Sequence, residues 1–276
     1  MGTYLRPDRL EEALAALARP MTVLAGGTDF YPARVGRAIN EDVLDISNIA
    51  SLRGIGATTR GWRIGATATW SELIAADLPP LFDGLKQAAR EVGGRQIQNT
   101  GTIAGNLCNA SPAADGVPPL LALDAQVQLL GRTGPRALPL SAFIIGNRRT
   151  ALAPDELVVA IDIPRPAHAA RSAFLKLGAR RYLVISIAMA AATLEIDGGR
   201  VVSARVAVGA CSAVAQRLAA LEAALVGAPL DAGLPQHVSA AHLAPLTPID
   251  DVRGSAAYRQ DAAVTLLRRL LAEFVP

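Results

Sequence analysis

The residues best suited to chemistry in this sequence are small and uncharged, and they gather between Gly93 and Asp115. This stretch holds four glycines and many hydroxyl and amide side chains, with a single charge, Arg95, before its final aspartate. Glycine tolerates positive φ and close approach of a ligand, and exposed N–H groups in such loops bind phosphate. The composition predicts an irregular binding loop, neither a regular helix nor an amphipathic strand; a plain turn between two elements is the alternative. The residues concerned are Gly93, Gly94, Thr100, Gly101, Thr102, Gly105, Asn106, Asn109 and Ser111.

A second glycine-containing loop lies near the start of the chain, at residues 24–29 (Leu-Ala-Gly-Gly-Thr-Asp). It follows a short apolar run from Met21 to Leu24 and precedes a mixed stretch that could begin a helix. A strand, a glycine turn and a helix in that order present N–H groups to a pyrophosphate. Two such loops, both nearly uncharged, suggest a long ligand held from two sides, and a dinucleotide fits that description.

Three motifs in these loops resemble those of the FAD-binding (medium) subunits of the molybdenum hydroxylases. They are Ala25-Gly-Gly-Thr-Asp29, Asn99-x-Gly-Thr-Ile-Ala-Gly-Asn106 and Ala110-Ser-Pro-x-x-Asp115. That family includes xanthine dehydrogenase, the aerobic carbon monoxide dehydrogenase and 4-hydroxybenzoyl-CoA reductase. The resemblance covers nearly the whole chain, and the Asn99–Asn106 motif with its Ser-Pro-x-x-Asp extension is its most specific part.

The resemblance implies a noncovalent FAD site built from both loops. Backbone N–H groups of the first loop, helped by the Thr28 hydroxyl, would bind the pyrophosphate, and the second loop would clamp it from the other side. The amide of Asn106 can both donate and accept, which suits ribityl or ribose hydroxyls. No His or Cys stands in the first loop, so we expect no covalent attachment there. The implied residues are Ala25, Gly26, Gly27, Thr28 and Asp29, then Thr102, Ala104, Gly105 and Asn106.

Three further residues enter the site through the same resemblance. Asp115 would accept hydrogen bonds from FAD hydroxyls, although it is also a plausible N-cap for a helix from Val117. Lys176 resembles the family's lysine near the flavin ring, where a cation favours the reduced anionic flavin; an exposed strand lysine is the alternative. Leu157, with Val158, matches apolar positions that contact the ring in relatives, and simple core residues are the alternative.

The sequence departs from the family pattern at two positions. Ala104 replaces the first of two glycines that usually precede Asn106, and its methyl group could restrict φ in the clamp. Val184 stands just before Ile185, where relatives commonly carry an acidic residue near the outer face of the ring. The electron acceptor (NAD, oxygen or quinone) therefore stays open, and Tyr182 is a candidate to cover the ring.

The remaining reactive residue types do not form a catalytic group. His168, His237 and His242 are expected at the surface, and the five-residue spacing of the last two is poor for a metal pair. Cys108 and Cys211 are too few for an iron–sulfur cluster or a structural zinc, so we expect free thiols and no metal site. For Cys108 a small buried packing role is preferred to that of a reactive thiol.

Length and composition bound the class of protein. With 276 residues and 51% hydrophobic residues, the chain has room for two domains with a sizeable core. The net charge of +3 is small and scattered, so nucleic acid is a poor candidate partner. The N-terminus has no apolar signal core, and the longest nearly apolar run, Leu183–Leu194, is too short to span a bilayer. We expect a cytoplasmic protein.

The pattern of short apolar runs and glycine turns predicts an α+β fold. The first loop lacks Gly-x-Gly-x-x-Gly, so a Rossmann domain is disfavoured. We expect an FAD-binding domain at residues 1–167, with two subdomains split near residues 55–60, and a C-terminal three-stranded antiparallel sheet with helices at residues 168–276. The predicted helices are 8–18, 71–76, 81–92, 117–123, 213–226, 236–241 and 258–274; the predicted strands are 23–25, 43–46, 64–66, 125–130, 157–163, 172–179, 185–196 and 200–211.

The resemblance implies the electron-transfer subunit of a molybdenum hydroxylase. FAD on this chain would carry electrons between two [2Fe–2S] clusters on a small partner and an external acceptor, while a large partner holds a molybdenum–pterin centre. Relatives form a dimer of heterotrimers. A cofactor-free scaffold subunit and a free-standing FAD oxidoreductase are the alternatives; the intact glycine loops argue against the first, and the lack of a catalytic His or Tyr pair argues against the second.

Overall fold

The computed structural model describes residues 2–275 and begins with a small parallel sheet. Strands β1 (Tyr4–Leu5), β3 (Val43–Asp45) and β2 (Thr22–Leu24) lie side by side in that order, and helix α1 (Leu10–Ala16) connects the first to the second in the chain. This helix is shorter than predicted at both ends. Arg9 takes the N-cap position, and the carboxylate of Asp8 accepts from the Asn48 amide.

A five-stranded antiparallel sheet forms the middle of the molecule, in the order β4-β5-β10-β6-β7. Its central strand, β10, carries the predicted apolar run at Leu157–Ile163. The edge strands β4 and β7 were not predicted, because an edge strand needs no buried face and these two carry glycine, proline and exposed residues. The bounds are β4 Ile55–Thr58, β5 Gly61–Gly65, β6 Gln126–Gly131, β7 Gly134–Pro139 and β10 Glu156–Pro164.

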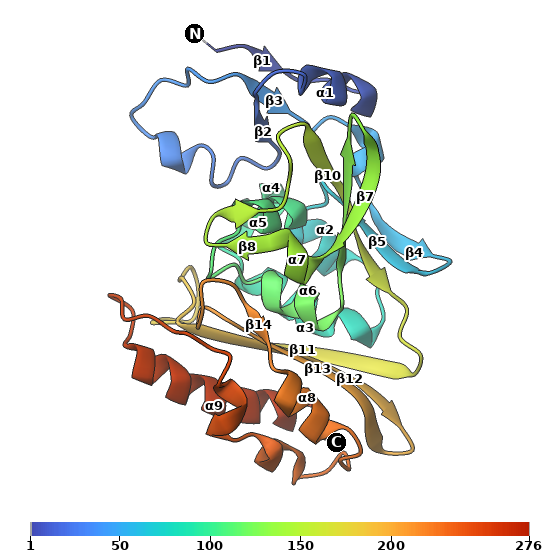
Figure 1. The fold of residues 1–276 in the computed structure, drawn as a ribbon, viewed down its shortest axis with the longest axis vertical. Coiled ribbons are helices and arrows are strands. Elements are labelled where there is room, and N and C mark those ends of the chain that lie inside the picture. Colours follow the sequence, from blue (N-terminus) through green and yellow to red (C-terminus); the bar gives the residue numbers. More distant parts are fainter. Residues whose placement is uncertain (1, 276) are drawn as a thin grey trace.

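Five short helices lie beside this sheet (Figure 1), and two of them occupy the stretch predicted to be irregular. Thr102 begins the second of these, because its hydroxyl accepts from the Gly105 N–H at 3.0 Å. Ile103 and Leu107 bury one face of the same helix. Small polar residues therefore form helix here once a cap and a buried face are supplied. The bounds are α2 Trp70–Ala75, α3 Asp83–Glu91, α4 Arg95–Thr100, α5 Ile103–Asn109 and α6 Val117–Ala122.

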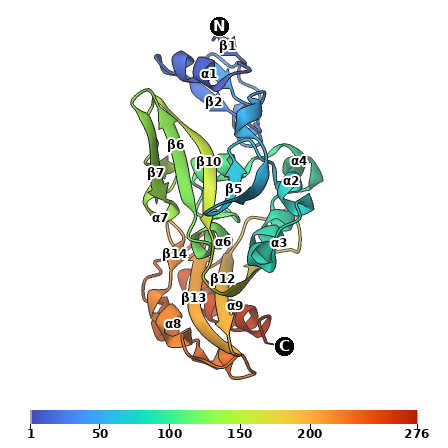
Figure 2. The same cartoon turned by 90° about the vertical axis from the view of Figure 1, so that its right-hand side faces the viewer.

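A second antiparallel sheet, β11-β12-β13-β14, forms the C-terminal half. Three of its strands were predicted; the short β14 was not. Gly198 and Gly199 have φ of 54° and 73°, which the tight turn between β12 and β13 requires. Figures 1 and 2 show α3 and α6 on one face of this sheet and α8 and α9 on the other, and β12 is accordingly buried on both faces. The bounds are β11 Ala169–Leu177, β12 Ala188–Asp197, β13 Arg200–Gly209, β14 Gln216–Arg217, α8 Ala219–Leu225 and α9 Ala256–Ala272.

The change of sheet falls between the end of β10 and the start of β11, and the division of the chain at residue 167 stays a prediction. The predicted helix at 236–241 is wrong, because two short 3-10 turns, Leu234–His237 and Ala240–Leu243, occupy that region. Within residues 2–275 no helix has both the length and the apolar composition needed to cross a bilayer. The remaining short elements are α7 Leu140–Phe143, β8 Ile144–Gly146 and β9 Arg149–Thr150.

Candidate functional site

The two glycine-containing loops touch each other. A side chain at Gly26 would overlap the carbonyl oxygen of Thr100, so only glycine lets the first loop lie against the second. Gly27 has φ of +71°, and a side chain there would strike the ring of Tyr31. A helix was expected to follow this loop, but only a 3-10 turn, Pro32–Arg34, does so. The first loop is therefore a turn held by its glycines, without a helix behind it.

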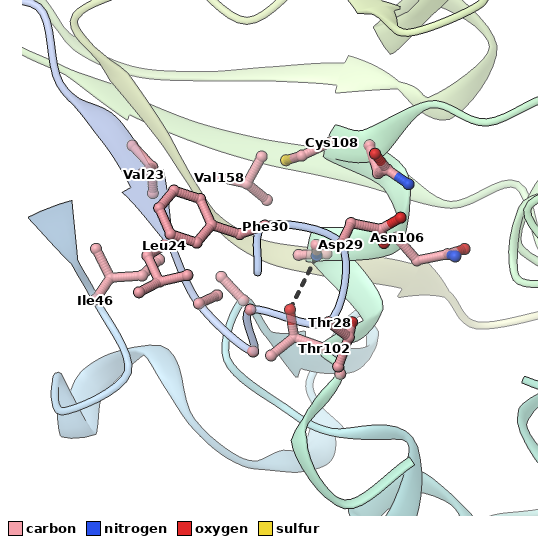
Figure 3. Close-up of a pocket in the computed structure, with 18 of the residues that line it drawn as sticks. Val23, Leu24, Thr28, Asp29, Phe30, Ile46, Thr102, Asn106, Cys108 and Val158 are labelled. Atoms are coloured by element: carbon pink, nitrogen blue, oxygen red, sulfur yellow. Dashed lines mark hydrogen bonds between the residues drawn. The ribbon is translucent and has the colours of Figure 1, made fainter. Parts of the chain in front are cut away.

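A cavity of about 500 Å³ opens between these loops and the first residues of β10 (Figure 3). All the predicted site residues except Asp115 and Lys176 line it. The structure therefore brings together segments that are far apart in the sequence. The lining residues that were predicted are Ala25, Gly26, Gly27, Thr28, Asp29, Thr102, Ala104, Gly105, Asn106, Leu157 and Val158.

One part of the cavity wall offers hydrogen-bond donors. None of the hydrogen bonds within residues 2–275 is donated by the backbone N–H groups of residues 26–29. Across from them, Asn106 Oδ1 is buried and has no partner within the same residues. Buried polar atoms without partners are uncommon in folded proteins and often mark a ligand site.

The position of Ala104 inside α5, buried at 3% exposure, shows that its methyl group fits a helical backbone.

One side of the cavity wall is apolar. Figure 3 shows Val23, Leu24, Phe30 and Ile46 on one side of the cavity and Asn106 and Thr102 on the other. The guanidinium carbon of Arg34 lies over the Phe30 ring, 3.8 Å from its centroid, which is a cation–π contact. A flat apolar group could therefore lie at one end of the cavity while a polar chain reaches the other.

Several lining residues were missed from the sequence. Val23 and Leu24 stand directly before the first loop, and Ile46 ends a predicted strand. Their positions in the sequence could therefore have indicated that they line the site. Val92 precedes Gly93, the first residue of the second loop, so its position gave the same indication. Leu152 comes from the connection before β10, and nothing in its sequence context marks it as part of a site.

Asp115 and Lys176 form a buried ion pair next to this region. Lys176 Nζ lies 2.7 Å from Asp115 Oδ2, and Ser186 donates to Asp115 Oδ1 at 2.5 Å. Burial raises the pKa of the Asp115 carboxyl, and the Lys176 ammonium and the Ser186 hydroxyl oppose that rise. The exposed strand lysine considered as an alternative is excluded, since the Lys176 side chain is 5% exposed.

Cys108 is not the buried packing residue that the sequence suggested. It is exposed to the cavity that it lines, and desolvation in this recess raises the pKa of its thiol to about 12. The sulfur is therefore reachable from the cavity but is a weak nucleophile at neutral pH.

The connection between β11 and β12 carries the second departure from the family pattern. Val184 lies against Gly178, where a side chain would overlap its methyl group. Leu183 has φ of +52°, its side chain contacts Gly94, and its carbonyl accepts from Arg180. Tyr182 is 56% exposed, with Arg181 over its ring, and is not among the residues that line the cavity.

Comparisons with known proteins agree with this architecture. The family described as "FAD binding domain in molybdopterin dehydrogenase" matches residues 1–166, and the "CO dehydrogenase flavoprotein C-terminal domain" matches residues 173–274. The chain is 30% identical to the xanthine dehydrogenase FAD-binding subunit of Escherichia coli O157:H7, over 99% of this chain and 96% of that one. It is 33% identical to the carbon monoxide dehydrogenase medium chain of Afipia carboxidovorans, over 96% and 94% of the two chains.

The fold is also that of a solved relative. A structure of reconstituted CO dehydrogenase from Oligotropha carboxidovorans superposes with a TM-score of 0.90 at 30% identity, covering 100% of this chain and 97% of that chain. The matched family models together span nearly the whole sequence. The chain therefore belongs to the FAD-binding medium subunits of the multi-subunit molybdenum-containing dehydrogenases.

Proposed function

We propose that this chain binds FAD noncovalently in the cavity between its glycine-containing loops and passes electrons between [2Fe–2S] clusters of a partner and an external acceptor. The observation that carries the proposal concerns residues 26–29, which line the cavity and whose backbone N–H groups donate to no acceptor within residues 2–275. Consecutive free N–H groups in a glycine turn are suited to the charge of a pyrophosphate.

The other walls of the cavity fit the rest of the cofactor. Asn106 lines the cavity, and its side-chain amide would exchange hydrogen bonds with a hydroxyl of the ribityl or ribose chain. The apolar side chains of Leu24, Phe30 and Ile46 would receive an aromatic ring. Lys176 would lie near the flavin ring, as the resemblance implies, and its ion-pair partner Asp115 would lie beside it.

The chemistry of electron transfer would belong to the cofactor, since a bound flavin takes two electrons and releases them singly or as a pair. The residues of this chain would hold FAD, exclude water from it and place a cation near it. The Lys176 ammonium, paired with Asp115, supplies that cation. These roles need no acid–base pair of the chain's own.

The partners follow from the same proposal. A large partner would carry the molybdenum–pterin centre and a small one the two [2Fe–2S] clusters, in a dimer of heterotrimers. Support comes from relatives described as medium chains, the carbon monoxide dehydrogenases of Afipia carboxidovorans and Hydrogenophaga pseudoflava among them.

The test is an absorption spectrum of the purified complex, and of the chain alone with added FAD, after gel filtration. Flavin bands that stay with the protein are the expected result, and a variant with Asp115→Ala and Asn106→Ala should lose them. A complex without flavin would overturn the proposal and favour a scaffold subunit. Full retention of FAD by the double variant would remove Asp115 and Asn106 from the site.

A further inference from the structure

Arg259 is a buried cation that takes no part in the cavity. It lies on α9 and is 3% exposed. Its Nη1 donates to the carbonyl oxygens of Ile187 and Ala210, at 2.6 and 3.0 Å, and its Nη2 donates to Asp251 Oδ1 at 2.6 Å. Its Nε has no partner within residues 2–275. Two of the three bonds of this buried charge therefore go to backbone carbonyls of two separate connections.

Both connections donate hydrogen bonds to the segment Pro112–Asp115. The N–H of Ala210 donates to the carbonyl of Pro112 at 3.0 Å. The hydroxyl of Ser186, the residue before Ile187, donates to Asp115 at 2.5 Å. The guanidinium of Arg259 thus joins two contacts that reach Pro112 and Asp115 from two different connections of the C-terminal sheet.

The backbone at Ala210 needs such support. Its φ is +62°, a left-handed conformation that is unfavourable for an alanine. It is held there from both sides, through its N–H by Pro112 and through its carbonyl by Arg259. Without the guanidinium, the carbonyl is free to rotate toward a relaxed conformation and the bond to Pro112 is weakened.

We propose that Arg259 is a positioning residue for the Pro112–Asp115 segment, and through Asp115 for the Lys176 ammonium. The inference that this segment then positions the flavin rests on the proposed function. Arg259 contacts neither the cavity nor the ion pair itself, so it acts through Ile187 and Ala210. A residue of the C-terminal helix thereby sets the geometry of a site in the FAD-binding half of the chain.

The test uses the full chain with Arg259→Met, which keeps an unbranched apolar side chain but removes the donors of the guanidinium. Arg268→Met is the matched control, because Arg268 lies on the same helix and, within residues 2–275, donates only to the Val238 carbonyl. Amide hydrogen exchange at Ala210, without FAD, should be about tenfold faster in Arg259→Met, as expected for loss of a charged hydrogen bond, and unchanged in the control.

With FAD added, the same variant should bind about tenfold more weakly, with a shifted flavin reduction potential, and Arg259→Lys should recover part of both. A merely structural role would lower the unfolding temperature and leave the potential of the bound flavin unchanged. Should Arg259→Met fail to fold, Asp251→Ala removes the acceptor of Arg259 Nη2 and should shift exchange in the same direction.

A folded Arg259→Met chain with unchanged exchange at Ala210 and unchanged flavin affinity and potential would overturn the inference. If the wild-type complex binds no FAD, the proposed function fails, and the exchange measurement still decides whether Arg259 positions the segment.

Discussion

The ammonium of Lys176 and the carboxylate of Asp115 lie 2.7 Å apart with side chains that are 5% and 9% exposed. Lys176 belongs to β11 of the C-terminal sheet, and Asp115 precedes α6 in the FAD-binding half. The pair therefore joins the two parts of the chain at the border of the proposed site. Because burial raises the pKa of Asp115 in spite of this partner, the charged pair itself adds little net stability.

Removing one member of this pair should cost far more than removing both. Asp115→Asn leaves a buried ammonium without a counter-charge, so we expect the free energy of unfolding to fall by about 3 kcal/mol. Asp115→Asn combined with Lys176→Met should recover most of that loss. Urea unfolding of the wild type, both single variants and the double variant gives the coupling energy. Additive losses would contradict a direct interaction between the two side chains.

Gly26→Ala should separate the two loops. The added methyl group overlaps the Thr100 carbonyl, so the backbone must shift, at a cost of about 1–3 kcal/mol. FAD binding, measured by flavin fluorescence, should weaken by about tenfold or more. Gly56→Ala is the control, since a side chain at Gly56 meets nothing within 4 Å. Equal FAD affinity of the two variants would show that loop contact is not needed for binding.

Cys108 should report whether the cavity is filled. Since burial raises the pKa of its thiol to about 12, we expect it to react with a maleimide about 1000-fold more slowly at pH 7 than a free cysteine. The rate should rise with pH, and added FAD should suppress it. Mass spectrometry identifies the labelled residue, and Cys108→Ser, which leaves only the buried Cys211, provides the control. Labelling that FAD does not slow would place the cofactor elsewhere.

Glu156 should make stability depend on acid pH. Its hydrogen bonds with Arg136, at 2.5 and 2.7 Å, lower the pKa of the Glu156 carboxyl, although burial acts against them. A lowered pKa contributes stability above the pKa of the unfolded state, and this stability is lost as the pH falls through the lower folded value.

Glu156→Gln should therefore reduce the free energy of unfolding by about 1–2 kcal/mol near pH 7, since Arg136 is partly exposed. The difference from the wild type should vanish in acid. Asp155→Asn, at the neighbouring position, leaves the Arg136 pair intact and should not show this pH dependence. Unfolding curves at several pH values between neutral and strongly acidic conditions are the measurement, and a constant difference across them would refute the assignment.

Local signals in the sequence were sufficient for the elements that need no distant partner. The turn at Gly198–Gly199 could be predicted because two glycines between apolar runs can adopt the positive φ angles that a tight hairpin requires. Helix α6 could be predicted because an apolar run follows Asp115 and has prolines in its first turn. The short strand β14 could not be predicted, because two residues are too few to show hydrophobic alternation. They pair only where β13 is already in place.

The α4–α5 region shows the opposite case. Its glycines and polar residues favour a loop when read alone. The Thr102 hydroxyl caps the helix, and Ile103 and Leu107 are buried against the core. These tertiary contacts stabilise a helix over the loop that the local sequence favours.

What the sequence by itself determined is the set of loop residues and their family, since glycine spacing and small polar side chains are local properties of the chain. Only the tertiary structure decided that residues 24–29, the Thr102–Asn106 segment and Leu157 line one cavity, and that Asp115 and Lys176 pair with each other beside it. The physical reason is that a cavity and a buried ion pair are made by side chains far apart in sequence. Their distances are fixed by the order and register of the sheets, which no single segment encodes.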